Sequence, residues 1–418
     1  MEKVFASIIT IGDELLIGQV IDTNSAWIAQ ALNEKGILLK HRVAVGDIRE
    51  DIWQALDEES KQASLVIITG GLGPTADDIT KPLLCEYFDG KMVVDQPTLE
   101  HLQQLFTQVL KRPMTERNAK QAEVPDTCTV LLNKSGTAPG MLFRKRDTVF
   151  IALPGVPVEM KWIMTNQVLP MLPSLFKTGS VQHRTLQTYG IGESYLADLI
   201  QDLETALPPH IKLAYLPNHG MVRLRLTGTS DNADSLRQEL LAHADLLKAR
   251  IQDYLVSDED IPMEKIVGKL LLQYGKTVAT AESCTGGYIA QLLSTHPGSS
   301  AFFWGSIVSY DNRIKEALLQ VPASVLETAG AVSEATVRQM LKGVLAQIQT
   351  DYAVAVSGIL GPDGGTPDKP VGTVWIAVGN ATSIQAHQFH FRFDRLRNRE
   401  LTAMNALNLL RIFILENH

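Results

Sequence analysis

The sequence predicts an α/β protein in which two α/β domains are joined by a small α+β module. Short apolar runs that end near glycine alternate with stretches of helical periodicity, as in sheets covered by helices. This alternation occurs twice, on either side of a segment with longer alternating strands. The 418 residues are 45% hydrophobic and 20% charged, which is ordinary for a globular chain of roughly two to four domains.

The first domain is predicted over residues 1–177. Its expected strands cover residues 4–11, 37–45 and 64–69, and its expected helices cover residues 24–32, 48–63 and 158–176. A parallel sheet is the economical fold for this order of elements. In such sheets, ligands bind beyond the carboxyl ends of the strands.

The other two segments are predicted over residues 178–256 and 257–418. The middle module has expected strands over residues 181–189 and around the turn at 217–220, and expected helices over residues 193–203 and 233–249. In the third domain we expect strands that end at Thr280 and that cover residues 302–310, 352–356 and 371–378. Its expected helices cover residues 263–274, 312–319, 333–348 and 394–414, with a further one after Gly287.

Charge and cysteine content limit the expected partners and compartment. The formal net charge of −8 argues against a general nucleic-acid-binding role, although a local basic patch is compatible with it. Cys85, Cys128 and Cys284 are odd in number and far apart, which suits a reducing cytosol and gives no metal-ligand spacing. We find neither a signal peptide nor an apolar run of about 18 residues, so we expect a cytoplasmic protein that does not contact membranes.

Two turns at predicted strand ends of the first domain carry polar groups. Residues 12–14, followed by Asp22 and Asn24, come after the first strand, and residues 69–80 (TGGLGPTADDIT) come after a later one. The second turn can bring backbone N–H groups to a phosphate, and the nearby carboxylates can hold a divalent cation. The candidate groups are Gly70, Gly71, Gly73, Thr75 and Asn24 for the substrate, and Asp13, Asp22, Asp77 and Asp78 for the metal. The alternative is that Asp77 caps a helix and that Asp13 and Glu14 are solvated.

The third domain contains a turn with two candidate nucleophiles. Residues 280–287 (TAESCTGG) stand between a predicted strand and a predicted helix, and they include Ser283 and Cys284. A helix N-terminus attracts an anion or a developing oxyanion. A thiol there has a lowered pKa, so chemistry alone favours Cys284. The alternative is that Ser283 or Thr285 only caps the helix.

The third domain resembles a known family from roughly residue 263 onward. Besides residues 280–287 it contains SYDNRIK at 309–315 and SGILGPDGGTPDKPVG at 357–372. These motifs are similar to those of the competence/damage-inducible CinA family. The C-terminal domain of that family is the nicotinamide mononucleotide deamidase that also occurs as the stand-alone enzyme PncC.

The resemblance implies roles for individual residues of the third domain. Ser283 would be the nucleophile, and Lys315, in a Tyr-x-Asn-x-x-Lys motif, would be the base. Because a solvated lysine has a pKa near 10.4, this role requires Lys315 to be desolvated or beside another cation. Tyr310 would hydrogen-bond within the site or stack on the pyridinium ring. The groups expected to bind the substrate are Thr285, Gly286, Gly287, Asn312, Ser357, Gly358, Gly361, Gly364, Gly365 and either Arg395 or Arg399. Leu360 stands where the family commonly has a small residue, so it either narrows the pocket or packs inward.

The first two segments resemble the other parts of CinA proteins. GDELLIGQVIDTNS and TGGLGPTADDIT match the molybdopterin-binding fold that opens them. The resemblance implies an ADP-ribose pyrophosphatase that releases AMP and ribose 5-phosphate with a divalent metal (Mg, Mn or Co), with K⁺ as a further candidate ion. The middle module is similar to a KH domain but lacks a GXXG loop, so we expect a spacer or dimerisation arm and no nucleic acid.

The expected function is therefore that of a bifunctional enzyme acting on breakdown products of NAD. It would deamidate nicotinamide mononucleotide without a cofactor and hydrolyse ADP-ribose, and relatives imply a homodimer. Two alternatives stay open: a non-catalytic nucleotide sensor or scaffold in competence or DNA damage response, and molybdopterin binding by the first domain.

Overall fold

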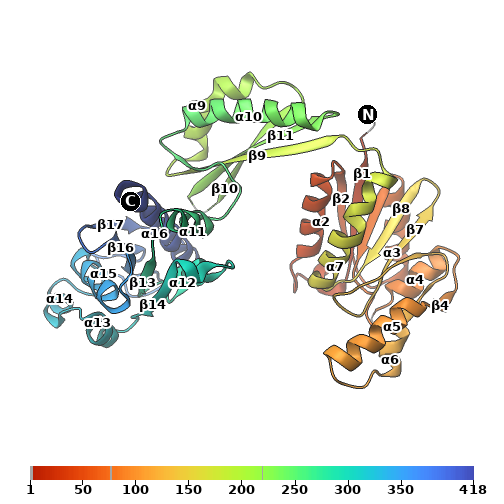
Figure 1. The fold of residues 1–418 in the computed structure, drawn as a ribbon, viewed down its shortest axis with the longest axis horizontal. Helices are drawn as coiled ribbons and strands as arrows, with labels where there is room; N and C mark the ends of the chain where they lie inside the picture. Colours follow the sequence, from red (N-terminus) through yellow and green to blue (C-terminus); the bar gives the residue numbers. More distant parts are fainter. Residues whose placement is uncertain (1–2, 76–77, 219) are drawn as a thin grey trace. The chain divides into compact units, whose positions relative to one another are not determined.

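The computed structural model describes residues 3–75, 78–218 and 220–418, and contacts divide the chain into two units (Figure 1). The first unit contains the chain up to His183, and the second contains Ala242–His418. The middle segment contributes residues to both. The α/β class of the two large domains and the mixed character of the middle module are confirmed.

A six-stranded sheet with the order β2-β1-β3-β8-β7-β6 forms the centre of the N-terminal domain. Its parallel members are β1 (Phe5–Ile11), β2 (Leu38–Val45), β3 (Leu65–Thr69) and β8 (Thr148–Leu153). The antiparallel members are β7 (Gly140–Lys145) and β6 (Thr129–Leu131). The predicted parallel sheet is therefore correct for its first three strands but misses three strands after residue 128.

Helices and short elements surround this sheet. The first ones are α1 (Asp13–Leu16), α2 (Thr23–Glu34), α3 (Arg49–Ser60) and α4 (Thr80–Tyr87). An unpredicted region holds β4 (Met92–Val94), α5 (Gln96–Gln104), η1 (Leu105–Val109), α6 (Glu116–Ala119), η2 (Lys120–Ala122) and β5 (Glu123–Pro125). The single helix predicted over residues 158–176 is instead α7 (Pro157–Ile163), the π-helix η3 (Met164–Val168) and α8 (Leu169–Leu175). Pro170 and Pro173 have no N–H to continue the regular ladder, which fits this break.

The middle segment forms a four-stranded sheet with the order β10-β11-β9-β12 and two helices. Its elements are β9 (Ser180–Tyr189), α9 (Glu193–Thr205), β10 (Ile211–Asn218), β11 (Met221–Ser230), α10 (Ala233–Arg250) and β12 (Leu255–Ser257). The predicted strands and helices are all present, and the turn at 217–220 includes His219, which lies outside the described residues.

The C-terminal domain has a five-stranded sheet with the order β14-β13-β15-β16-β17. These strands are β13 (Val278–Glu282), β14 (Phe303–Val308), β15 (Tyr352–Gly358), β16 (Thr373–Gly379) and β17 (Ile384–His390). β13 pairs in parallel with β14 and β15, whereas β16 and β17 are antiparallel. β17 was not predicted, because its residues are mostly polar or partly exposed.

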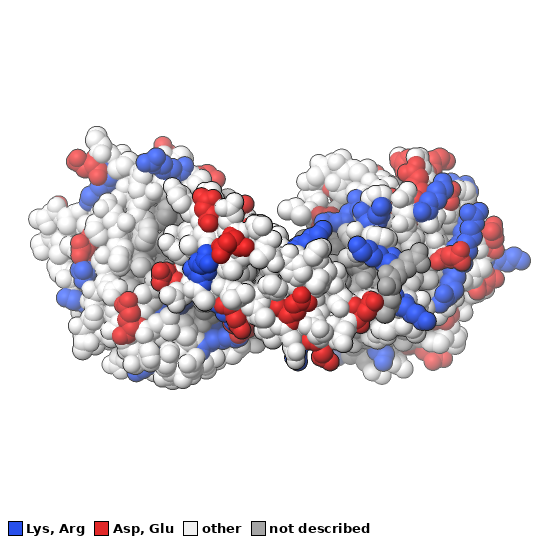
Figure 2. Space-filling model, turned by 90° about the horizontal axis from the view of Figure 1, so that it is seen from above, with Lys and Arg blue, Asp and Glu red and all other residues white. Residues whose placement is uncertain are grey.

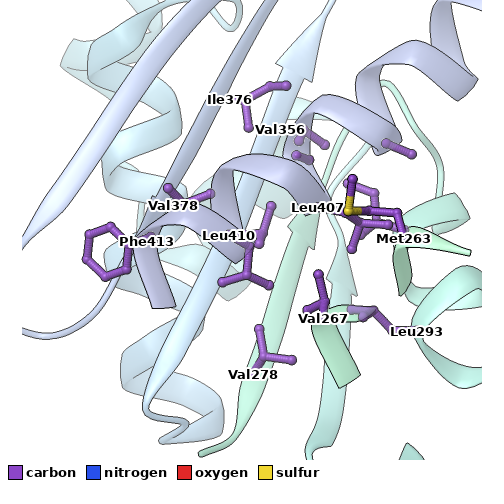
Figure 3. Close-up of a cluster of buried hydrophobic side chains, with 14 of the residues drawn as sticks. Met263, Val267, Val278, Leu293, Val356, Ile376, Val378, Leu407, Leu410 and Phe413 are labelled. Carbon is purple, nitrogen blue, oxygen red and sulfur yellow. The ribbon is translucent and has the colours of Figure 1, made fainter. Parts of the chain in front are cut away.

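Helices cover both faces of this sheet. One face packs on α11 (Met263–Gln273), α12 (Tyr288–Ser294) and α16 (Arg395–Asn417), through Val267, Leu407 and Phe413 among others (Figure 3). The other face packs on α13 (Asn312–Leu319), α14 (Ala323–Thr328) and α15 (Glu334–Ile348). The short η4 (Ser299–Ala301) precedes β14. This double cover buries the strands and leaves their carboxyl ends to form a site.

Candidate functional site

Strand β13 ends at Glu282, two residues later than predicted, and Ser283 follows directly. The Glu282 side chain is fully buried. Its carboxylate accepts hydrogen bonds from the Thr285 hydroxyl at 2.7 Å and from the backbone N–H groups of Gly287, Ile289 and Ala290 at 2.8–3.1 Å. Glu282 therefore neutralises the start of α12 and fixes the turn that carries Ser283.

This arrangement differs from the expected use of the turn. The N–H group of Gly286 donates to the Ser283 carbonyl, and that of Gly287 donates to Glu282. Neither glycine nor Thr285 lines the pocket beside Ser283. The expectation that these three residues bind an oxyanion or phosphate does not fit, because none of them lines the cavity and the Thr285 hydroxyl and both glycine N–H groups donate within the turn. The signal that sequence reasoning missed is an acidic residue just before a helix N-terminus.

A cavity of about 260 Å³ lies beside Ser283 at the carboxyl end of the sheet. The structure brings together most of the predicted residues of this domain around it: Ser283, Cys284, Tyr310, Asn312, Lys315, Ser357, Gly358, Gly361, Gly364 and Arg395. Gly365 and Arg399 do not line it. Asp363 lines it and was not predicted. The volume is close to the lower end of the range for small-molecule sites.

Lys315 is the most unusual side chain of this cavity. It is only 1% exposed, and its ammonium donates to the backbone carbonyls of Ser309 at 2.8 Å and Tyr310 at 3.2 Å. Burial lowers the pKa of Lys315 below its ordinary 10.5, and the nearby Asp311 carboxylate opposes this effect only in part. The Asp311 side chain itself bonds to Arg313. The desolvation that a base at this position requires is thus present.

The environment of Cys284 corrects the expectation of a reactive thiol. The side chain is 7% exposed, and burial together with the Glu282 carboxylate raises the pKa of Cys284 to about 12. The expected lowering does not occur because the donors at the start of α12 face Glu282. Cys284 therefore stays a protonated thiol at neutral pH.

The two candidate phosphate-binding arginines lie in different surroundings. The Arg395 guanidinium donates to the Gly361 carbonyl at 2.8 Å and to the Tyr310 hydroxyl at 2.7 Å, at the edge of the cavity. Arg399 instead lies over the ring of Tyr288, 4.7 Å from its centroid. Of the two, only Arg395 can reach a ligand in this cavity. Leu360 packs with the core, is 3% exposed and also lines the cavity, so both expected outcomes apply.

The Ser357 hydroxyl is used within the protein. It donates to the Ala331 carbonyl at 2.7 Å, so Ser357 fixes the wall of the cavity. Tyr310 is 60% exposed and lines the cavity. An aromatic ring of this kind can stack on a cationic ring.

The N-terminal domain has a second and larger cavity, of about 450 Å³, at the carboxyl ends of β1, β3 and β8. Predicted residues that line it are Asp22, Asn24, Gly70, Gly71, Gly73 and Asp78. Gly70 and Gly71 have φ values of 117° and 65°, and a side chain at either would collide with Ile11 or Thr80. The Thr75 N–H and hydroxyl donate to Asp78 and do not reach the cavity lining.

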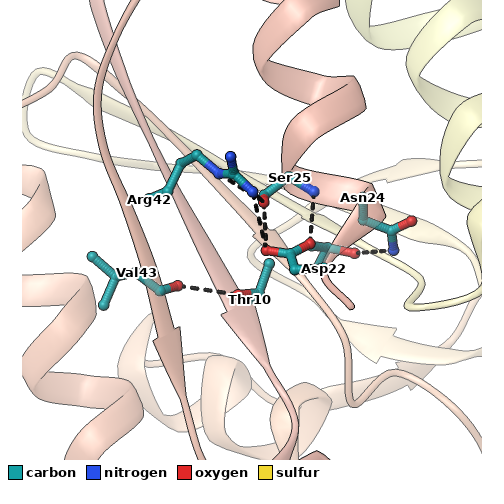
Figure 4. Close-up of polar contacts among 7 residues, drawn as sticks. Thr10, Asp22, Asn24, Ser25, Arg42 and Val43 are labelled. Atoms are coloured by element: carbon teal, nitrogen blue, oxygen red, sulfur yellow. Dashed lines mark hydrogen bonds and ion pairs between the residues drawn. The ribbon is translucent and has the colours of Figure 1, made fainter. Parts of the chain in front are cut away.

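The candidate metal ligands do not converge in the structure. Asp13 is exposed and exchanges hydrogen bonds with the backbone and side chain of Asp47, outside the cavity lining. Asp22 caps α2 through the N–H group and hydroxyl of Ser25, and it pairs with Arg42 at 3.8 Å (Figure 4). Asp77 lies outside the described residues.

The described part of the chain holds no group of three or more His, Cys, Asp or Glu side chains that could bind a metal ion. The three predicted aspartates that the structure describes, Asp13, Asp22 and Asp78, therefore form no preformed metal site with other described residues. Asp22 and Asp78 both line the cavity.

Sequence reasoning missed two charged groups of the N-terminal domain, the half-buried Glu159 and the buried Lys81. Glu159 lines the cavity, and burial raises its pKa although Asn133 donates to it at 2.5 Å. Lys81 is 6% exposed and donates to the carbonyls of Gln121 and Glu123, both at 3.0 Å. Burial lowers the pKa of Lys81 to about 8. A buried charge gives no signal in composition or periodicity.

Both charge signs occur on each unit, and Figure 2 shows Lys and Arg side chains interspersed with Asp and Glu on the face in view. Within the described ranges, no helix has both the length and the apolar character needed to cross a bilayer.

Comparison with known proteins accounts for this organisation of fold and sites. Residues 7–174 match the model of a molybdopterin-binding domain, residues 183–257 that of the damage-inducible protein CinA KH domain, and residues 260–414 that of the CinA C-terminal domain. The chain is thus a three-part protein with a molybdopterin-binding-like domain, a KH module and a CinA domain.

Full-length relatives extend this match. A CinA-like protein of Cytophaga hutchinsonii is 46% identical over 408 residues, which cover 98% of this chain and 97% of the relative. One from Flavobacterium psychrophilum is 42% identical over 99% of both chains. A crystal structure of competence damage-inducible protein A from Klebsiella pneumoniae overlaps 37% of this chain and 97% of its own, with 34% identity and a TM-score of 0.37. The chain belongs to the CinA family.

Proposed function

We propose that the C-terminal domain hydrolyses the carboxamide of nicotinamide mononucleotide to the acid and ammonia. The observation that carries this proposal is the buried Lys315, whose pKa is lowered and which lines the same cavity as Ser283. An uncharged lysine is a suitable base for a serine nucleophile.

Acyl transfer in this cavity proceeds in two balanced stages. The Ser283 hydroxyl oxygen attacks the carboxamide carbon while its proton passes to the neutral Lys315 amine. Lys315 then donates that proton to the leaving nitrogen, the C–N bond breaks, and ammonia departs. Water next adds to the ester with Lys315 again as base, which releases the carboxylic acid and restores the serine.

Other residues of the cavity suit the remaining parts of this substrate. The exposed ring of Tyr310 can stack on the pyridinium ring, and the amide of Asn312 can orient the carboxamide. The Arg395 guanidinium has N–H groups beyond its bonds to Gly361 and Tyr310 that can pair with the phosphate. No cofactor takes part in this proposed reaction.

The test is ammonia release from nicotinamide mononucleotide by purified protein. Ser283→Ala is expected to abolish turnover, whereas the matched control Ser294→Ala, which changes an exposed serine of α12, keeps it. Ammonia release by Ser283→Ala at the wild-type rate would reject Ser283 as the nucleophile. A wild-type protein that releases no ammonia would favour a non-catalytic nucleotide sensor.

A second candidate function concerns the N-terminal cavity. Its volume of about 450 Å³ and its position at the carboxyl ends of parallel strands favour a nucleotide-sized ligand, and we propose ADP-ribose, cleaved to AMP and ribose 5-phosphate. Because the described carboxylates do not form a metal site, we derive no step through a metal ion. Binding of ADP-ribose to the full chain, followed calorimetrically with and without Mg²⁺, tests the assignment. Tighter binding of a pterin than of ADP-ribose would replace it.

A further inference from the structure

The side-chain amide of Asn24 has an unpaired oxygen at the N-terminal cavity. Asn24 lies in the first turn of α2, is 9% exposed and lines the cavity. Its nitrogen donates to the Gly155 carbonyl at 2.7 Å and to the Thr69 hydroxyl at 3.3 Å. Its oxygen is buried and has no hydrogen-bond partner, as Figure 4 shows with a dashed line at the nitrogen alone.

The hydrogen-bond network fixes the orientation of this amide. The Gly155 carbonyl can only accept, and the single Thr69 hydroxyl proton is directed to the Pro154 carbonyl at 3.0 Å. A flipped Asn24 amide would therefore set its oxygen against two acceptors. The free group that Asn24 offers at the cavity is thus an acceptor.

Gln121 supplies a second amide at the same cavity. It is 2% exposed, lines the cavity, and its side-chain oxygen is also buried without a partner. The backbone of Gln121 is fixed, because its carbonyl accepts a hydrogen bond from the Lys81 ammonium at 3.0 Å. Two unpaired buried amide oxygens at one cavity are unusual, since buried polar groups are nearly always satisfied.

The charges of the cavity lining favour hydrogen-bond donors over phosphates. Four carboxylates line it, from Glu14, Asp22, Asp78 and Glu159, and no Lys, Arg or His does so among the described residues. A phosphate presents only acceptors and negative charge at neutral pH, so among the described lining residues it finds no side chain of opposite charge. Hydroxyl and amino groups would be attracted to it.

We propose that the Asn24 and Gln121 amide oxygens form a subsite for the nucleoside part of the ligand, accepting hydrogen bonds from its sugar hydroxyls or its exocyclic amine. The inference rests on the proposed function of this domain, and it assigns the nucleoside part of the substrate to these two residues. The phosphates are then assigned to the glycine turn at Gly70 and Gly71, which lines the same cavity.

Calorimetric titration of the full chain with adenosine, which carries no phosphate, tests the subsite. The isosteric change Gln121→Met and the change Asn24→Leu are each expected to weaken adenosine binding about tenfold, since each removes one buried hydrogen bond. Gln167→Met is the matched control: this partly buried glutamine bonds to the Leu132 carbonyl away from the cavity. The control is expected to bind adenosine like wild type.

Three analogues identify which donors are recognised. Weaker binding of inosine assigns the exocyclic amine, and weaker binding of 2′-deoxyadenosine or 3′-deoxyadenosine assigns the sugar hydroxyls. Equal adenosine affinity in wild type and Gln121→Met would overturn the inference, as would wild type that binds ribose 5-phosphate or pyrophosphate but not adenosine. If Asn24→Leu fails to fold, the adenosine affinity of Gln121→Met alone tests the subsite. Intact adenosine binding without ADP-ribose hydrolysis would reject the proposed reaction and keep the subsite.

Discussion

Each α/β domain of this protein contains a buried lysine, and the two lysines differ in what lies beside them. Lys81 in the N-terminal domain and Lys315 in the C-terminal domain each donate to two backbone carbonyls, and burial lowers both pKa values. Only Lys315 lines a cavity, which it shares with Ser283. Lys81 does not line the N-terminal cavity and holds the backbone of Gln121 instead.

This comparison teaches that a lowered pKa alone does not define a catalytic lysine. The amine must also meet a nucleophile in a space that admits substrate. By this criterion we propose Lys315 as a base and Lys81 as a structural group. The predictions below separate the two roles.

The largest effect is expected for Lys315→Met. Loss of the base should lower ammonia release from nicotinamide mononucleotide by about 10²–10⁴-fold. In wild type the rate should rise with pH as Lys315 loses its proton and level off below pH 10.5, its ordinary pKa. The control Lys342→Met removes an exposed lysine of α15 and should keep both rate and profile. If Lys315→Met kept the pH profile of wild type, Lys315 would not be the base, and the proposed difference in role between Lys315 and Lys81 would be wrong.

The next effect concerns the turn that carries the nucleophile. Glu282→Gln replaces an acceptor of several N–H groups by a side chain that is half donor, so the turn should shift and kcat should fall about 10–100-fold. Glu264→Gln, at another buried glutamate of the same domain, is the control. Unchanged kcat together with lowered thermal stability in Glu282→Gln would show that Glu282 serves stability only.

Arg395→Gln should raise KM for nicotinamide mononucleotide about tenfold, because one charge-assisted bond to the phosphate is lost. KM for nicotinamide riboside, which has no phosphate, should stay constant. Arg399→Gln, on the same helix but outside the cavity, is the matched control. An equal rise of KM for both substrates would mean that Arg395 acts through Tyr310 and not through the phosphate.

Lys81 should affect stability and leave ammonia release unchanged. Its native pKa is about 8 and its unfolded value is 10.5, so between these pH values the unfolded chain binds the extra proton. The free energy of unfolding should therefore rise with pH in this window, by up to about 3 kcal/mol. Lys81→Met should flatten this rise in calorimetric scans at pH 8–10.5. The same rise in the variant would show that another group causes it.

The smallest effect is expected for Cys284→Ala. A protonated thiol with a pKa of about 12 takes no part in the reaction, so ammonia release should equal that of wild type within assay error. Loss of turnover in this variant, with Ser283→Ala still active, would make Cys284 the nucleophile.

Much of the fold could be predicted from the sequence, because apolar periodicity reports burial directly. The helix over residues 312–319 has the predicted bounds, and β1, β2 and β3 begin within a residue of their predicted starts. Weak periodicity accounts for some of the errors, although not for the missed strands β7 and β8, whose residues are mostly apolar and buried. The polar edge strand β17 and the short elements between residues 92 and 131 have no clear apolar pattern.

The sequence allowed us to predict which residues form the candidate site, but it was less informative about their chemical properties. Motifs marked Ser283 and Lys315, and the last helix offered either Arg395 or Arg399. The fold gathers Ser283, Lys315 and Arg395 at one cavity. The pKa of Cys284 was expected in the wrong direction, because the partner of the helix N-terminus is Glu282, whose role depends on where β13 ends. The described candidate aspartates of the first domain each form a hydrogen bond with a nearby group of the protein, and sequence spacing does not reveal these bonds.

Acid quenching during turnover, followed by peptide mass spectrometry, can detect the covalent intermediate of the proposed reaction. We expect the peptide carrying Ser283 to gain the acyl group of nicotinate mononucleotide in wild type and Cys284→Ala but not in Ser283→Ala. An adduct that persists in Ser283→Ala and disappears in Cys284→Ala would show that Cys284, and not Ser283, is the nucleophile.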